Sequence, residues 1–182
     1  MPETALKIRV YGDSILRSRA ALVKSVDAGS RQILSSMAVT MYEGNGVGLA
    51  APQVGISQQL IVVDIGSGLY KLVNPRIIKR QGTQVTQEGC LSVPGICINV
   101  KRAMKVWLKA LDENGKFVDM QAEGLLACVF QHEIDHLKGK LIVDYAKLFD
   151  KVKMKKKLSV LESKAKENAA CQPLKKQCRL KI

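Results

Sequence analysis

The chain has 182 residues, of which 47% are hydrophobic and 25% are charged, as expected for one globular domain with a single core. Its net charge is +13, but residues 151–182 hold eleven Lys and Arg against two Glu and so contribute +9 of it (11 − 2). No apolar run approaches the roughly 20 residues that a membrane span needs, and the N-terminal residues lack an apolar signal core, so we expect a cytoplasmic protein without a membrane partner.

The first predicted element is a helix over residues 27–44. Apolar residues recur there at helical spacing, Asp27 is suited to cap the N-terminal end, and Gly44 is suited to end the helix. The small-residue segment Gly46–Gln53 follows. It is too short and too rich in glycine for a helix, and its backbone can be approached closely by another chain.

Extended segments dominate the middle of the chain. Asn74-Pro75 interrupts one of them, which predicts an edge or a bend, and Asn114-Gly115 predicts a hairpin turn between the last two. The predicted strands cover residues 59–65, 71–78, 84–88, 96–100, 105–111 and 116–122.

Two helices follow the strands. The first is strongly apolar, covers residues 125–137 and ends at Gly139, and the second covers about residues 146–166. Residues 168–182 are expected to be frayed or disordered. This order predicts an α+β fold in which mostly antiparallel sheets pack around the first of these helices, with a further C-terminal helix.

The two histidines of the chain both lie on that apolar helix, in the sequence His132-Glu133-Ile134-Asp135-His136. Positions i and i+4 share a helix face, so His132 and His136 can bind one metal ion, and Glu133 can reach a water on that ion as a general base. The alternative is two structural histidines on one face. Burying two imidazoles and a carboxylate without a purpose would be costly, which favours the metal site.

A stable site needs a third ligand, and no histidine follows His136. The five cysteines are odd in number and loosely spaced, which argues against a disulfide framework. Cys90, in the segment Glu88–Ser92, is the upstream candidate, because a thiolate binds Zn²⁺ or Fe²⁺ well. The alternative for Cys90 is a small buried hydrophobic residue.

Three segments together resemble the signature blocks of the peptide deformylases. These are Gly46–Gln53, Glu88–Ser92 and Gln131–His136, which occur in the family's order and at similar spacing, and Ile8–Asp13 is also similar. The resemblance covers residues 6 to 150 and implies a hydrolase that removes the formyl group from the N-terminal methionine of new polypeptides. We accordingly predict a catalytic domain over residues 1–150 and a basic helix and tail over 151–182.

The resemblance implies a role for each motif residue. It makes Cys90, His132 and His136 the ligands of an ion that is usually Fe²⁺, with Zn²⁺, Ni²⁺ or Co²⁺ able to substitute. The softness of these ligands does not by itself separate zinc from iron. Glu133 would be the general base.

The Gln53 side chain and the Leu91 backbone N–H would stabilise the negative oxygen of the tetrahedral intermediate. The alternative for Gln53 is a loop amide that caps the turn at Pro52.

The substrate would lie between two glycine-containing segments. The backbone of Gly46, Val47 and Gly48 is suited to receive an extended peptide as an added strand, and Gly89 would line the other side. Val129 would form a wall of the methionine pocket, or be an ordinary core residue.

Three further residues bear on the site. Glu88 and Arg102 resemble a family ion pair that holds the ligand loop, and Asp135 would orient a histidine or solvate the helix. Cys97 departs from many relatives, which carry Arg or Tyr at this position near the pocket rim.

Two other functions fit parts of the sequence. A zinc endopeptidase would share the histidine helix but not need Cys90, and an RNA-binding protein with a structural metal would show no turnover. The basic tail suggests an anionic partner such as ribosomal RNA, because phosphate attraction does not depend on sequence. We expect no DNA partner. The alternative for the tail is a solvated helix with a frayed end.

Overall fold

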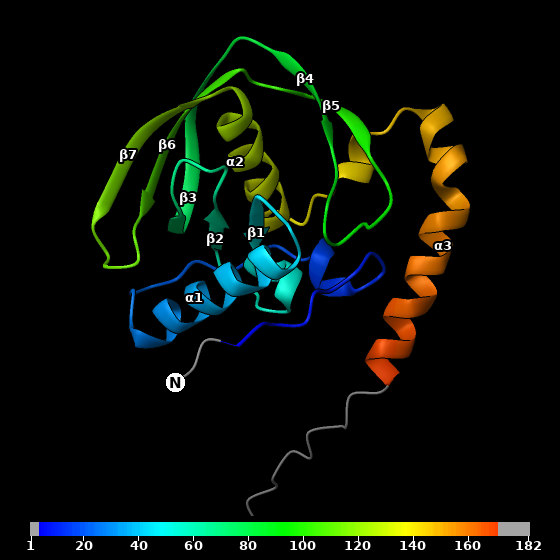
Figure 1. Cartoon of the computed structure of the whole chain (residues 1–182), viewed down its shortest axis with the longest axis horizontal. Helices are drawn as coiled ribbons and strands as arrows, with labels where there is room; N and C mark the ends of the chain where they lie inside the picture. Colours follow the sequence, from blue (N-terminus) through cyan, green and yellow to red (C-terminus); the bar gives the residue numbers. More distant parts are fainter. Residues whose placement is uncertain (1–3, 171–182) are drawn as a thin grey trace, which may run out of the picture.

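A computed structural model describes residues 4–170 and has the α+β architecture predicted from the sequence (Figure 1). A five-stranded antiparallel sheet has the order β1-β2-β3-β6-β7, and β4 and β5 form a separate two-stranded sheet. Helix α2 lies between the two sheets, α1 packs on β1 and β2, and α3 runs along the outside beside β5. The strands are β1 (Gly48–Ala50), β2 (Leu60–Val63), β3 (Tyr70–Gln81), β4 (Gln84–Glu88), β5 (Ile98–Arg102), β6 (Lys105–Leu111) and β7 (Phe117–Glu123), and the helices are α1 (Ala28–Glu43), α2 (Gly124–Leu137) and α3 (Leu148–Ala170).

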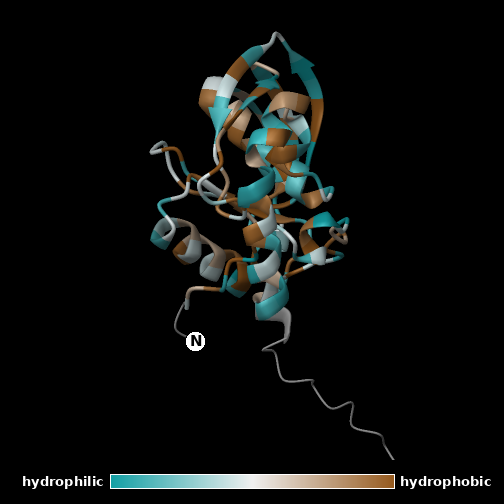
Figure 2. Ribbon diagram, turned by 90° about the vertical axis from the view of Figure 1, so that its right-hand side faces the viewer, coloured by the Kyte–Doolittle hydropathy of each residue, from teal (hydrophilic) through white to brown (hydrophobic). Residues whose placement is uncertain are grey.

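Strand β2 is buried on both faces, which explains its unbroken apolar sequence. Side chains alternate along a strand, so Leu60 and Val62 pack in the cluster that contains α1, while Ile61 and Val63 pack in the cluster that contains α2. The strand thus joins two cores. Figure 2 shows the hydrophobic residues gathered where the helices meet the strands, with hydrophilic residues on the strand tips.

The predicted interruption at Asn74-Pro75 is an irregularity inside one long strand. β3 continues through it, with a register shift against β6 between Val73 and Arg76. Asn74 adopts a positive φ of 53°, and its side chain bonds to the backbone N–H and C=O of Val23 at 2.9 and 2.8 Å. These two bonds stabilise a backbone conformation that a branched residue would rarely adopt.

Helix α2 is held at its middle and just after its C-terminal end. The Gln131 side chain accepts from the Ala103 N–H and donates to the Ala103 C=O, both at 3.0 Å. After the helix, Gly139 has a φ of 73°, and a side chain there would collide with the backbone of Arg17. The helix that carries the histidine motif therefore has little freedom to shift.

The structure differs from the predicted elements in two places. Strand β1, in the small-residue segment, was not predicted and pairs with β2, and α3 continues through Ala170 where fraying was expected. The rest of the predicted frayed segment, 171–182, lies outside the described residues. Among residues 4–170, no helix is both long and apolar enough to cross a bilayer.

Candidate metal centre

Two distant segments bring three potential metal ligands together. Cys90 follows the end of β4, while His132 and His136 lie one turn apart on α2. The Cys90 Sγ is 3.3 Å from the His136 Nε2, the two Nε2 atoms are 3.2 Å apart, and all three ligand atoms lie within 4.8 Å of one another. Atoms that share a tetrahedral ion with these ligand types are about 3.3–3.6 Å apart, so the two distances at His136 Nε2 are close to those that such an ion requires.

The orientation of His132 leaves one ring nitrogen for an ion. Its Nδ1 lies 2.9 Å from Glu88 Oε2, and donation to that carboxylate leaves Nε2 as the metal-facing atom. Burial alone would lower the pKa of His132, but interactions with Cys90 and Glu88 raise it well above its ordinary value. The surroundings of this imidazole thus favour positive charge.

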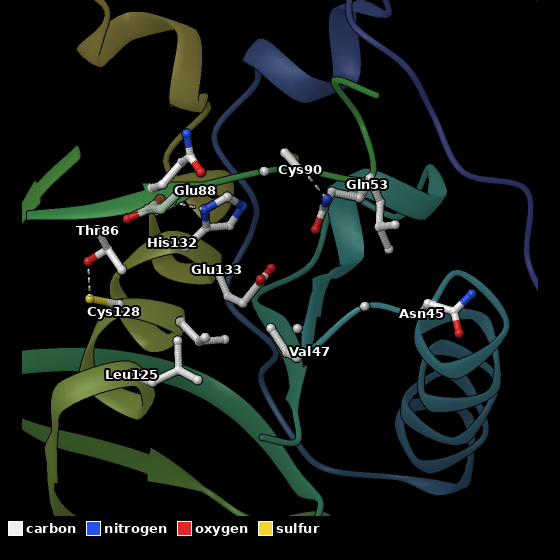
Figure 3. Close-up of a pocket in the computed structure, with 16 residues that line it drawn as sticks. Asn45, Val47, Gln53, Thr86, Glu88, Cys90, Leu125, Cys128, His132 and Glu133 are labelled. Carbon is white, nitrogen blue, oxygen red and sulfur yellow. Dashed lines mark hydrogen bonds and ion pairs between the residues drawn. The ribbon is translucent and has the colours of Figure 1, made fainter. Parts of the chain in front are cut away.

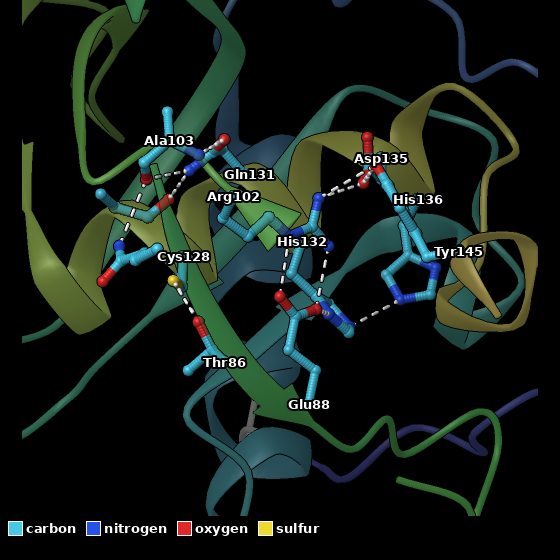
Figure 4. Close-up of polar contacts among 12 residues, drawn as sticks. Thr86, Glu88, Arg102, Ala103, Cys128, Gln131, His132, Asp135, His136 and Tyr145 are labelled. Atoms are coloured by element: carbon cyan, nitrogen blue, oxygen red, sulfur yellow. Dashed lines mark hydrogen bonds and ion pairs between the residues drawn. The ribbon is translucent and has the colours of Figure 1, made fainter. Parts of the chain in front are cut away.

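Glu88 is itself fixed by a buried ion pair (Figure 4). Arg102 donates from Nε and Nη2 to the two Glu88 oxygens at 2.7 and 2.9 Å. Burial would raise the pKa of Glu88, but the Arg102 and His132 bonds hold it below its ordinary value. The expected Glu88–Arg102 pair is therefore present. Asp135 bonds to Arg102, so it does not orient a histidine directly as expected.

Glu133 is a buried carboxylate that faces a pocket. Its side chain is 3% exposed, and within residues 4–170 its Oε2 has no hydrogen-bond partner. Burial raises the pKa of Glu133 to about 7, although the nearby charge of His132 opposes the shift. Figure 3 shows the side chain next to His132 and directed into the pocket. An unpartnered carboxylate at such a place is suited to exchange protons with a bound molecule.

Gln53 joins β1 to the ligand loop. Its Oε1 accepts from the Ala50 N–H at 2.8 Å, so part of its role is to cap the turn. Its Nε2 is directed at Cys90 Sγ, 3.5 Å away, and at Ser92 Oγ, 3.3 Å away. The amide thus caps the turn and also presents a donor beside the three ligand atoms.

The residues predicted from the sequence share one cavity of about 350 Å³. Every residue predicted for catalysis and substrate binding lines it, together with Cys90 and His132. His136 does not line it, but its Nε2 lies 3.2 Å from that of His132. Cys97 does not line this cavity itself but a neighbouring cleft between the ligand loop and α3. A Cβ at Gly89, which lines the cavity, would lie 3.8 Å from Cys97 Sγ, so Cys97 is near the rim as predicted. The residues predicted in the cavity are Gly46, Val47, Gly48, Gln53, Gly89, Cys90, Leu91, Val129, His132 and Glu133.

Sequence reasoning missed several lining residues, among them Thr86, Leu125 and Cys128. Thr86 Oγ1 lies 3.0 Å from Cys128 Sγ and links the wall formed by β4 to the wall formed by α2 (Figure 3). Periodicity could have found them: Thr86 is two residues before Glu88 on one strand face, and Leu125 and Cys128 precede His132 by two helical turns and one.

Comparison with known proteins agrees with this geometry. The model of the polypeptide deformylase family matches residues 5–168. The chain belongs to the polypeptide deformylase family. A deformylase of Syntrophomonas wolfei is 54% identical over 134 residues, and the match covers 74% of this chain and 88% of the relative. A deformylase of Halothermothrix orenii is 51% identical over 141 residues, and the match covers 76% of this chain and 92% of the relative. The deformylase structure from Legionella pneumophila has a TM-score of 0.82 at 42% identity and covers 93% of this chain and 100% of its own.

Family membership decides between the functions that the sequence allowed. As a deformylase, the chain is a hydrolase that removes the N-formyl group from newly synthesised polypeptides. The interpretations as an endopeptidase and as an RNA-binding protein without turnover are therefore wrong.

The deformylase pocket makes Gly48 a sensitive position. A Cβ there would collide with Glu133 Oε1 and lie 2.8 Å from Val129 Cγ1. We expect Gly48→Ala to displace the Glu133 carboxylate and lower kcat for formyl-Met-Ala by about 100-fold, because moving groups of an active-site pocket by about 1 Å can cost that much. Formate release measures the effect.

The control for this prediction is Gly29→Ala, which adds the same methyl group in the first turn of α1 and meets only Asp27 at 3.3 Å or beyond. Its activity should match that of wild type. A Gly48→Ala variant with wild-type kcat would show that Glu133 does not depend on the space beside this glycine.

Proposed function

We propose that Cys90, His132 and His136 hold the catalytic metal ion of this deformylase, that Glu133 is its general base, and that Gln53 and Leu91 stabilise the reacting oxygen. The convergence of a thiol and two imidazoles beside an unpartnered buried carboxylate carries the proposal. Formate release from formyl-Met-Ala without oxygen, by wild type beside Glu133→Ala, tests it.

In this proposal, Glu133 accepts the proton of the attacking water and later gives it to the leaving amine. The new C–O bond forms at the formyl carbon, the C–N bond breaks, and formate and a free methionyl amine result. The Gln53 side-chain N–H and the Leu91 backbone N–H donate to the oxygen that becomes negative. A bound divalent ion would supply Lewis acidity, which lowers the pKa of a coordinated water and polarises the formyl carbonyl.

We propose Fe²⁺ as the working ion, with Zn²⁺, Ni²⁺ or Co²⁺ able to replace it. One thiolate and two imidazoles suit each of these ions. The support for iron comes from the resemblance of the three motifs to those of deformylases that use it. Metal analysis of protein purified without oxygen distinguishes iron from zinc.

The substrate's backbone would pair with Gly46, Val47 and Gly48, and Gly89 would line the opposite side of the groove. Strand β1, which begins at Gly48, lies at one end of the five-stranded sheet, so its outer edge can receive a second strand. The methionine side chain would enter the part of the cavity that Val129 lines. The small space around the ligand atoms would reject acyl groups larger than formyl by steric clash.

We further propose that residues 1–150 form the catalytic part and that the basic segment 151–182 binds ribosomal RNA, in the cytoplasm, where formylated chains emerge. All residues that line the catalytic cavity precede residue 134. Helix α3 also exposes Leu148, Phe149 and Val152, with exposed fractions of 82%, 69% and 68%, next to its lysines. Exposed apolar and basic residues together suit a macromolecular contact.

Truncation is a poor test of this docking role, because Met154, Leu161 and Ala165 of α3 are buried in the core. A triple substitution is a better test. Changing the exposed Lys151, Lys155 and Lys156 to Glu should weaken ribosome binding and make the salt dependence of binding shallower. Loss of three phosphate contacts should reduce the slope of log K against log salt by about 2–3. Sedimentation with ribosomes at several salt concentrations gives this slope.

The matched control changes Lys24, Lys116 and Lys138 to Glu. These lysines are also exposed, and the change in net charge is the same, but they lie away from α3. Both triple variants should hydrolyse formyl-Met-Ala at the wild-type rate. Equal loss of binding in both variants would mean that overall charge, and not α3, attracts the ribosome.

A further inference from the structure

A hydrogen-bonded chain leads from His132 to a tyrosine outside the catalytic cavity (Figure 4). His132 contacts Glu88, and both oxygens of Glu88 accept from Arg102. The remaining Arg102 donor group, Nη1, bonds to Asp135 Oδ2 and to Tyr145 Oη, the latter at 3.2 Å. Tyr145 donates in turn to Asp135 Oδ2 at 2.6 Å.

Tyr145 closes this chain from a separate element. It is the last residue of the short 3-10 helix Ile142–Tyr145, whereas Asp135 lies on α2 and Arg102 at the end of β5. The three residues form a closed triangle of hydrogen bonds, and the Arg102 guanidinium also lies over the Tyr145 ring, 4.8 Å from its centroid. The Lys140 Nζ also lies over this ring, 3.7 Å from the same centroid.

The triangle matters because Arg102 has few other ways to be held. Its side chain is only 4% exposed, so water cannot replace a lost partner easily. With Asp135 and Tyr145 in place, the guanidinium plane has one orientation, and that orientation sets where the Glu88 carboxylate lies. Glu88 then determines the rotation of the His132 ring and which nitrogen faces the cluster.

We propose that Tyr145 is a positioning residue for the metal centre: its hydroxyl holds Asp135 against Arg102, and Arg102 orients His132 through Glu88. This inference rests on the proposed function, since it takes His132 as a ligand. It goes beyond the Glu88–Arg102 pair, because the orientation of a metal ligand then also depends on Tyr145, which lies in the segment after α2. Tyr145 would act on metal affinity without touching substrate or ion.

The test is the affinity of the metal-free full-length protein for Zn²⁺, measured by competition with a coloured chelator. Tyr145→Phe removes only the hydroxyl and keeps the ring that Arg102 and Lys140 contact. We expect its Kd for Zn²⁺ to rise about tenfold, at the low end of the range for residues that support a ligand from outside. A Kd within twofold of wild type would overturn the inference.

Tyr42→Phe is the matched control, because the Tyr42 hydroxyl also donates to an aspartate, Asp64, at 2.7 Å on the surface. Its Zn²⁺ affinity should equal that of wild type. A fall in the Tm of metal-free Tyr145→Phe with an unchanged Kd would show a purely structural role and overturn the proposal.

A double variant separates the proposed path from a general loss of stability. Asp135→Asn should weaken Zn²⁺ binding by itself, and adding Tyr145→Phe should weaken it by less than Tyr145→Phe does alone, because the hydroxyl and the carboxylate both act through Arg102. Additive effects would contradict the path. If the wild-type protein bound no Zn²⁺, the proposed metal centre would fail, a result distinct from equal binding by wild type and Tyr145→Phe.

Discussion

Glu133→Ala should abolish most formate release while leaving the metal content of the protein unchanged. The Glu133 carboxylate is buried and lines the cavity. Among residues 4–170, its Oε2 has no hydrogen-bond partner and is therefore able to accept a proton. Loss of a general acid–base group typically lowers kcat by about 10²–10⁴-fold, and no other side chain near the ligand atoms can replace it. The measurement is formate release from formyl-Met-Ala under anaerobic conditions, with metal analysis of the same samples.

Glu167→Ala is the control for this prediction, since it removes an exposed glutamate of α3 far from the cavity. It should keep wild-type kcat. Residual activity above a tenth of wild type in Glu133→Ala would exclude the general-base role, because another group would then be accepting the proton.

Cys90→Ser should remove the metal ion itself. Serine is a far weaker ligand than a thiolate for Zn²⁺ or Fe²⁺, and the two imidazoles that remain do not make a stable site. Changes that only support a ligand cost about 10–100-fold in metal affinity, so we expect a loss greater than about 100-fold when a ligand itself is replaced. Activity should fall with the metal content, as measured by metal analysis after dialysis against a weak chelator.

Cys97→Ser offers a control of the same chemistry seven residues later. Cys97 is exposed and lines the neighbouring cleft. The metal content of the Cys97→Ser variant should therefore match that of wild type. If Cys90→Ser kept its ion, the third ligand would have to be another residue, and the proposed metal centre would be wrong.

The predictions that agree best with the structure are those that concern a single helix, strand or turn. The range of β6 is the predicted one, Asp27 caps α1 through a 2.7 Å bond to the Ser30 N–H, and Gly115 adopts the positive φ that the hairpin turn requires. The interruption predicted at Asn74-Pro75 is present, but β3 lies inside the sheet and not at its edge, and the form of the interruption has a tertiary cause. The bonds of Asn74 to Val23, 51 residues away, hold the irregularity within the strand, and neighbouring residues contain no sign of them.

Strand β1 was missed for a similar reason. Three residues in a glycine-rich segment have little strand propensity of their own, and Gly48–Ala50 is extended because β2 supplies the hydrogen-bonding partner. Tyr145 and Asp135 illustrate the same limit, since ten residues separate them and only the turn after α2 brings the hydroxyl back to the carboxylate.

The sequence by itself determined which groups share one element: the spacing of His132 and His136 places two imidazoles on one helix face, and Glu133 follows the first of them. Only the tertiary structure decided the rest. It brought Cys90 to His136 across 46 residues and placed Gly48 of β1 against Glu133. The physical reason is that helical spacing is a property of one element, whereas contacts between elements depend on how the whole core packs.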